Sequence, residues 1–347
     1  MSIAADLLRR LAGDNPPKII GNAPHGADAQ LLAANARQHG VIHRPKALHI
    51  CLDDARLSQL KDQLAFFAPD IDVVTLPAWD CLPYDRVSPN ADLSAMRVAT
   101  LARLALQTPD KPQLILTTLN AATQRIVPKA WLSETCLTLK RGDAMAMEAL
   151  AIFLAERGYL RATTVNEAGD FAVRGGLLDV WPSGADAPLR LDFFGDELDT
   201  IRAFDPASQR TSHAVDALEI IPANELDFSP AAVKRFRMAY VEHFGAVIDD
   251  DPIYQAASEA RRAPGIDHWM PLFFSTLETV FDLIADDAVL TIEQAASEAA
   301  NDRFTAITDY YEARNSALEA EGQLSAPYKP LPPEALYLGE AEWSQRL

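Results

Sequence analysis

Short apolar runs alternate with helix-length segments along the first third of the chain, and this alternation limits the possible folds more than any other feature. Apolar runs at residues 47–52, 73–76 and 113–118 are separated by segments with helical spacing of apolar residues, such as 27–38 and 55–67. Strands that alternate with helices are typical of a parallel sheet with helices on its faces. We therefore expect an α/β domain with a parallel sheet.

The pattern changes after the first third. Strand-like runs at residues 171–180, 189–194 and 200–204 follow one another, with glycine turns between them. This spacing is typical of a small β-rich domain. Helix-length segments return after residue 222, and the apolar run 288–292 is again strand-like. We expect this last strand to rejoin the first sheet.

The chain of 347 residues is long enough for two or three separate cores. We predict that residues 1–128 form the first half of an α/β shell and that residues 129–222 form an inserted small α+β domain. Residues 223–347 are predicted to form the helix-rich second half of the shell. The last residues carry no helix-stop signal, so we expect them to connect to further domains of a longer protein.

The composition disfavours two classes of partner. The 49 acidic and 31 basic side chains give a formal charge of -18, which opposes binding to the phosphates of nucleic acids. No apolar run approaches the roughly 20 residues of a membrane span, so we expect no membrane contact. Three cysteines without paired spacing, and without a recognised metal-ligand spacing to any histidine, fit the reducing cytoplasm.

Residues 18–28 have the spacing of a phosphate-binding loop without its chemistry. Gly21 and Gly26 lie between a strand-like run and a helix in a G-x-x-x-x-G pattern. A working loop continues with a lysine, which reaches the phosphates, and a serine or threonine, which binds magnesium. Here Ala27 and Asp28 stand in those places. In a second interpretation the two glycines only form a turn; in both, we expect no ATP hydrolysis and no cofactor or metal in this chain.

Other enzyme chemistries find no support in the sequence. It contains no H-E-x-x-H and no G-x-S-x-G motif. The strand-like run 288–292 ends in Glu293 and Gln294 rather than in the acidic pair that would be typical of a magnesium-binding strand. We therefore expect a non-catalytic chain.

One strand-like run suggests a surface for a protein partner. Period-two alternation from residue 189 to residue 194 places apolar side chains on one face and polar or aromatic ones on the other. The first face has Leu189, Leu191 and Phe193, and the second has Arg190, Asp192 and Phe194. We expect Arg174 on the neighbouring strand of a hairpin. Exposed arginine and aromatic side chains are typical of interface hot spots.

The same pattern allows an alternative without a docking surface. A helix of the same domain would cover Phe194, and Arg190 would pair with Asp192 or Glu197. The residues alone leave both interpretations open.

Five separated segments of the chain resemble the N-terminal module of the bacterial transcription-repair-coupling factors (Mfd). They follow the family's order and together cover nearly the whole chain. The segments are residues 76–89 (LPAWDCLPYDRVSP), 169–182 (GDFAVRGGLLDVWP), 189–197 (LRLDFFGDE), 204–210 (FDPASQR) and 265–274 (GIDHWMPLFF).

This resemblance implies a fold similar to the excision-repair protein UvrB and a role in recruiting UvrA to lesions where RNA polymerase has stalled. It also implies that Arg174, Arg190 and Phe194, which match the family's UvrA-contacting positions, form the docking surface. The family protein has further domains that bind RNA polymerase, translocate on DNA with ATP and magnesium, and mask the UvrA site from the C-terminal end.

The sequence departs from UvrB at two places. UvrB has a working phosphate loop and a hairpin that grips damaged DNA, whereas this chain has Ala27 and Asp28 in the loop and no long insertion after Tyr84. Two alternative functions remain: a regulatory nucleotide site, and weak DNA binding through the basic residues Lys234, Arg235 and Arg237.

Overall fold

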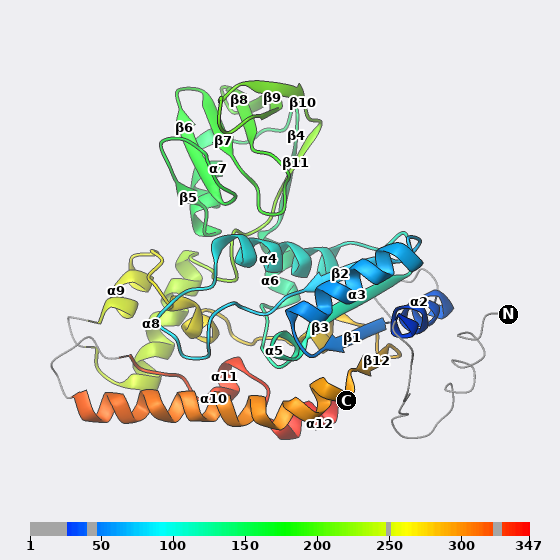
Figure 1. Ribbon diagram of the computed structural model, residues 1–347. Coiled ribbons are helices and arrows are strands. Elements are labelled where there is room, and N and C mark those ends of the chain that lie inside the picture. The colour runs from blue at the N-terminus through cyan, green and yellow to red at the C-terminus, as the bar shows by residue number, and fades with distance from the viewer. Residues whose placement is uncertain (1–25, 40–46, 248–250, 322–327) are drawn as a thin grey trace.

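The computed structural model describes residues 26–39, 47–247, 251–321 and 328–347. The strand expected at residues 18–20 and the loop glycine Gly21 lie outside these ranges. Figure 1 shows a β-rich domain standing on one side of a larger α/β shell, with the long helix α10 along the opposite side of the shell.

Four parallel strands form the sheet of the shell. They are β1 (Ala47–Cys51), β2 (Asp72–Leu76), β3 (Gln113–Thr118) and β12 (Val289–Ile292). Their order is β12-β1-β3-β2, and Leu48 of β1 lies opposite Leu290 of β12. The strand expected from the run 288–292 therefore does rejoin the first sheet, which supports the predicted α/β class.

Helices cover both faces of this sheet and extend beyond it. The α-helices are α2 (Ala27–His39), α3 (Asp54–Phe67), α4 (Ala91–Leu106), α5 (Leu119–Ala122), α6 (Lys129–Thr135), α8 (Pro230–Phe244), α9 (Pro252–Ser258), α10 (Gln294–Glu321), α11 (Pro333–Leu336) and α12 (Glu340–Arg346). Two 3-10 helices, η1 (Ile266–Phe273) and η2 (Val280–Leu283), lie between α9 and β12. In α3 the side chain of Asp53 accepts a hydrogen bond from the backbone N–H of Arg56, which caps the helix start. None of the described helices is long and apolar enough to cross a membrane.

The two faces of the sheet belong to different apolar clusters because side chains alternate along each strand. Leu48 and Ile50 of β1 lie in the large cluster that includes α4, α8 and α10. Ala47 and Cys51 point to the other face, where they pack with α2 and α3. His49 shares this second face, since it lies between them at the same spacing.

The β-rich domain has a six-stranded sheet, a two-stranded sheet and one helix. Its elements are β4 (Leu137–Lys140), α7 (Met147–Glu156), β5 (Leu160–Arg161), β6 (Asp170–Arg174), β7 (Leu177–Val180), β8 (Leu189–Phe194), β9 (Glu197–Phe204), β10 (Thr211–Ala214) and β11 (Ala217–Ile220). The large sheet has the order β10-β9-β8-β7-β6-β5, and β11 pairs with β4. One face of the large sheet, with Leu178, Leu191 and Ile201, packs with Leu150 and Leu154 of α7.

This domain has an apolar cluster separate from those of the shell, which extends from Leu137 to Ala223. Trp131 and Leu132 of α6 lie in the large cluster of the shell instead. The predicted domain boundaries after residues 128 and 222 stay a prediction.

A buried ion pair joins the two halves of the shell. Arg97 of α4 donates to both carboxylate oxygens of Glu225, at 2.8 and 3.0 Å. The Trp79 indole N–H donates to the same carboxylate at 2.8 Å. Both charged side chains are almost completely buried. Glu225 follows the inserted domain in sequence, so the pair fixes the returning chain to the first half.

His268 of η1 lies in the large core between aromatic rings. The centre of its ring lies 5.8 Å from the centre of the Trp79 ring, edge-on, and 6.5 Å from the centre of the Tyr84 ring, nearly parallel to it. Neither ring nitrogen has a hydrogen-bond partner among the described residues. Burial lowers the pKa of His268 to about 4. The charge of Asp85 opposes this shift, and the charge of Arg314 adds to it.

Candidate functional site

Phe194 stands out from the β-rich domain at the end of β8. Its side chain is 84% exposed, the highest value among the large apolar residues that the structure describes. The next residue, Gly195, has a φ of 63° and begins a two-residue turn into β9, as in a type II′ hairpin. Phe193 instead packs against the domain core. The predicted alternation of the strand is thus observed, and Phe194 is bare rather than covered by a helix.

Arg190 is held within the domain. Its Nε and Nη2 donate to the two oxygens of Asp179, both at 2.7 Å, and Nη1 donates to the carbonyl of Gln209 at 3.2 Å. The guanidinium lies 4.9 Å from the centre of the Phe204 ring. The hydrogen bond to Asp179 raises the pKa of Arg190 above its ordinary value. Arg190 does have an internal partner, but this partner is Asp179 on β7 and not Asp192 or Glu197.

Arg174 lies on β6, and the expectation that it belongs to the strand next to β8 is wrong. β7 separates β6 from β8, because Gly175 and Gly176 turn the chain before Leu177. Arg174 donates to the Thr163 carbonyl at 2.6 Å and to the Thr164 hydroxyl at 2.8 Å. The register still places Arg174 and Arg190 on the same face of the sheet, since direct partners across neighbouring strands share a face.

A further arginine on this face is missing from the sequence-based expectation. Arg202 of β9 lies directly opposite Arg190 and is exposed. Period-two alternation in residues 197–204 would have identified it, because Ile201 and Ala203 on either side are buried. The polar face thus has three arginines, with Phe194 at the end of the same strand as Arg190.

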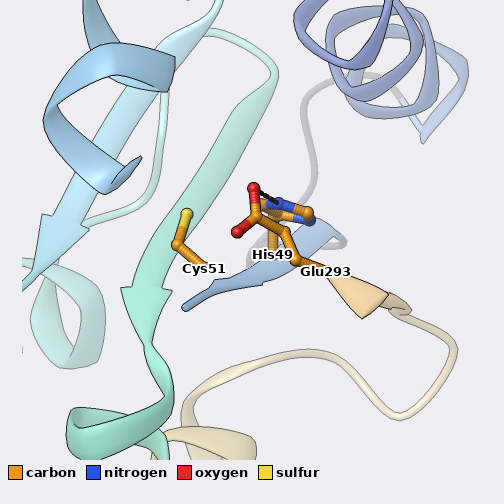
Figure 2. Close-up of side chains that lie close together, drawn as sticks. All are labelled: His49, Cys51 and Glu293. Atoms are coloured by element: carbon orange, nitrogen blue, oxygen red, sulfur yellow. Dashed lines mark ion pairs between the residues drawn. The ribbon is translucent and has the colours of Figure 1, made fainter. Parts of the chain in front are cut away.

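A second group of polar side chains lies at the carboxyl ends of β1 and β12 in the shell. Figure 2 shows His49, Cys51 and Glu293 close together there. One ligand-type atom from each lies within 4.8 Å of the others. Burial raises the pKa of the Cys51 thiol to about 12. No short spacing in the sequence marks Cys51 as a metal ligand, because Glu293 comes from a distant part of the chain.

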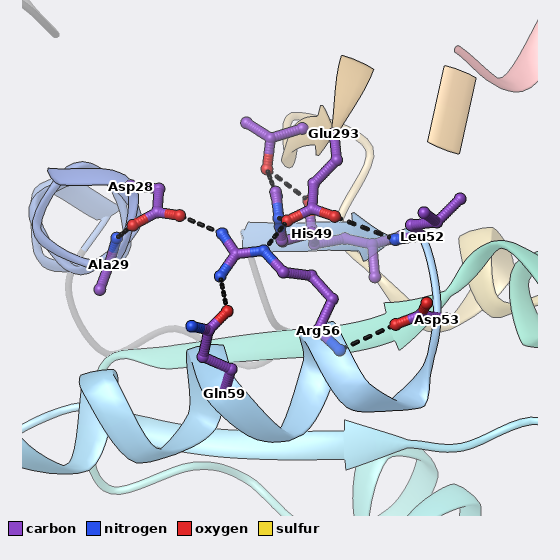
Figure 3. A network of polar contacts seen from close by, with 10 residues as sticks. Asp28, Ala29, His49, Leu52, Asp53, Arg56, Gln59 and Glu293 are labelled. Atoms are coloured by element: carbon purple, nitrogen blue, oxygen red, sulfur yellow. Dashed lines mark hydrogen bonds and ion pairs between the residues drawn. The ribbon is translucent and has the colours of Figure 1, made fainter. Parts of the chain in front are cut away.

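An arginine joins this group to the first turn of α2 (Figure 3). Arg56 Nε donates to Glu293 Oε1 at 2.5 Å, and Arg56 Nη2 bonds to Asp28. The backbone N–H of Leu52 donates to the other oxygen of Glu293 at 3.0 Å. Burial opposes the charge of Arg56, but the bonds to Asp28 and Glu293 raise its pKa above the ordinary value.

Asp28 lies in the first turn of α2. Gly26 has a φ of 81°, α2 begins at Ala27, and Asp28 accepts a hydrogen bond from the N–H of Ala29 at 2.8 Å. The carboxylate therefore occupies a helix N-terminus that would otherwise favour an anion.

Comparison with known proteins agrees with this architecture. Residues 137–226 match the family model of the UvrB interaction domain. The chain is 32% identical over 338 residues to the transcription-repair-coupling factor of Haemophilus influenzae, which covers 96% of this chain and 28% of the relative. It is 33% identical to the factor of Escherichia coli over 92% of this chain and 27% of the relative. The factor of Myxococcus xanthus is 33% identical over 72% of this chain and 22% of the relative.

The chain thus spans about a quarter of the length of the curated relatives that it matches. The agreement of fold, matched domain and identity over nearly the whole chain leads to one assignment: the chain is an N-terminal, UvrB-homology module of the transcription-repair-coupling factor family.

Proposed function

We propose that this module docks UvrA in transcription-coupled nucleotide excision repair, through the face of the β-rich domain that has Arg174, Arg190 and Phe194. The observation that carries the proposal is the exposure of Phe194, an aromatic side chain that is 84% open to solvent on an otherwise well-packed strand. Burying such a ring against a partner removes a large apolar area from water, and aromatic residues with neighbouring arginines dominate many interfaces.

The three residues contribute in different ways. Phe194 brings contact area, while Arg174 and Arg190 are oriented by Thr163 and Asp179 before any partner arrives. Orientation in the free protein reduces the entropy that is lost on binding. We expect the acceptor groups of UvrA on this face to be carboxylates, which match arginine geometry.

The proposal is tested by calorimetric titration of purified UvrA with the chain and with Phe194→Ala. Loss of one hot-spot aromatic residue costs about 2 kcal/mol, so Kd should rise about 30-fold. Met238→Ala, which removes a 65% exposed apolar side chain from α8 of the shell, is the matched control and should leave Kd unchanged. Equal affinity of Phe194→Ala and the native chain would place the docking surface elsewhere.

The proposal extends to the full-length protein of the family. The motor that uses ATP and magnesium, the contacts with RNA polymerase and DNA, and the C-terminal domain that masks the UvrA site belong to the remaining three quarters of the family protein. The present chain acts in the cytoplasm as a docking module without catalysis.

The Asp28–Arg56–Glu293 network supports the absence of nucleotide handling in this module. Among the described residues of this network, Arg56 is paired with two carboxylates, so it offers no net positive charge to a phosphate. Titration with ATP and magnesium should show no binding heat. Magnesium-dependent binding would instead support the alternative of a regulatory nucleotide site.

A further inference from the structure

The cluster of His49, Cys51 and Glu293 has properties that the docking function does not use. β1 supplies His49 and Cys51 from one face, because they are two residues apart on a strand. β12 supplies Glu293, whose backbone N–H donates to the Ile50 carbonyl at 3.0 Å and so fixes the residue beside Cys51. His49 is only 6% exposed and Cys51 is fully buried.

The hydrogen bonds of Thr291 favour one tautomer of His49. The Thr291 hydroxyl donates to the Leu48 carbonyl at 3.2 Å. A hydroxyl has a single proton, so with this bond made it accepts at His49 Nδ1, which lies 2.9 Å away. In this arrangement the neutral ring has its proton on Nδ1, and Nε2 presents a lone pair.

This lone pair faces the cluster and has no hydrogen-bond partner among the described residues. The nearest charged atom is Glu293 Oε1, at 3.9 Å, which is itself an acceptor. Two acceptors that face each other in a buried place need a proton or a cation between them. A histidine held at Nδ1 by a second residue, with Nε2 free, is also the usual arrangement of a metal ligand.

The charges favour a divalent cation. Asp28, Arg56 and Glu293 together have a net charge of -1 when Cys51 is a neutral thiol. A divalent ion that binds as Cys51 loses its proton brings this sum to zero. The bonds of Arg56 to Asp28 and Glu293 can remain, since each uses only part of the carboxylate.

The distances fit a small ion after a modest adjustment. In a tetrahedral zinc site with bonds of about 2.0 to 2.3 Å, ligand atoms lie roughly 3.3 to 3.8 Å apart. The histidine and carboxylate atoms are already 3.9 Å apart, and the widest separation in the cluster is within 4.8 Å. Rotation of the Cys51 side chain that moves its Sγ by about 1 Å closes the difference.

We propose that His49, Cys51 and Glu293 bind one divalent ion of the zinc class, with the fourth position taken by water. Sulfur and imidazole ligands select such ions over magnesium or calcium. The ion would fasten β12 to β1 at the sheet edge. This proposal is independent of UvrA docking.

The test uses the whole chain, treated with a chelator, dialysed and titrated with Co²⁺ or Zn²⁺ alone. We expect one ion per chain, and with Co²⁺ a thiolate-to-metal absorption band. Cys51→Ser keeps the size of the side chain and should abolish the band, whereas Cys136→Ser, at a half-buried cysteine outside the cluster, should retain it. Thr291→Val should weaken Zn²⁺ binding by about 10- to 100-fold, because it removes the acceptor that orients His49.

Uptake by the native chain decides the proposal even if a variant fails to fold, and circular dichroism identifies such a variant. No uptake by the native chain, or an equal band in Cys51→Ser, would overturn it. An NMR spectrum with both His49 nitrogens protonated near pH 7 would also overturn it, because the pair would then be an imidazolium with Glu293.

Discussion

In the shell, charged side chains at the sheet edge turn toward one another: Arg56 bonds to Asp28 and Glu293, and Arg97 bonds to a buried Glu225. In the β-rich domain, Arg174 and Arg190 of the outer face are held by acceptors of the same domain, whereas Phe194 on the same face is 84% exposed. The difference indicates that the shell uses its charges to hold itself together, whereas the β-rich domain leaves an aromatic ring open to solvent, as the proposed docking surface requires.

The largest effect is expected where the shell depends on a buried pair. Glu225→Ala leaves Arg97 charged and enclosed, which typically costs about 3 to 5 kcal/mol of unfolding free energy. Chemical denaturation measures this loss, with Glu242→Ala on the exposed side of α8 as control. A loss of unfolding free energy below about 1 kcal/mol is the size expected of a surface ion pair. Such a result would mean that the shell does not depend on the Arg97–Glu225 pair, and the contrast between shell and β-rich domain would fail.

Acid should weaken the shell through His268. The unfolded chain binds a proton on this ring near pH 6.5, whereas the folded protein does so only near pH 4. Unfolding free energy should therefore fall as pH drops from about 6.5 to 4, by about 3 kcal/mol at most. His268→Phe should flatten this part of the pH profile, and His213→Gln, at an exposed position, should not. Identical profiles for the native chain and His268→Phe would remove His268 as the cause.

Arg190 connects the two kinds of behaviour. Arg190→Ala leaves the nearly buried Asp179 without its partner, so we expect a loss of about 2 kcal/mol in unfolding free energy. Arg190→Ala combined with Asp179→Asn should recover part of it. A weaker UvrA affinity of the single variant Arg190→Ala could therefore come from lost stability and not from a lost contact. An unchanged unfolding midpoint of Arg190→Ala in denaturant would show instead that Arg190 acts only at the surface.

The smallest effect sharpens the contrast. Phe194→Ala should change unfolding free energy by less than about 0.5 kcal/mol, because an exposed ring contributes little to the folded state. Thermal unfolding measured beside the UvrA titration separates the two properties. A clear loss of stability would mean that Phe194 supports its own domain.

Local patterns predicted much of this structure. The alternation of apolar runs predicted the parallel sheet, and period two in β8 predicted which side chains of that strand share the face opposite the core. Partners from other strands could not be predicted in this way. Arg190 pairs with Asp179 because β7 lies beside β8, and the sequence does not specify that pairing.

Helix starts and distant clusters show the same limit. Aspartate is a common cap residue, so Asp92 is a candidate for the start of α4, but Asn90 caps this helix and its side chain accepts a hydrogen bond from the Asp92 backbone N–H. The position of Glu293 beside Cys51 depends on β12 pairing with β1, a contact between residues more than 200 positions apart. No short motif contains that information.

The pairing of β12 with β1 also has a consequence for synthesis on the ribosome. His49 meets Thr291 across 242 positions of sequence, and the whole β-rich domain is translated between them. A nascent chain thus presents one unpaired side of β1 until β12 emerges, while the domain with Phe194 already has all of its own strands. The face with Phe194 is therefore complete before the sheet of the shell has gained its last strand.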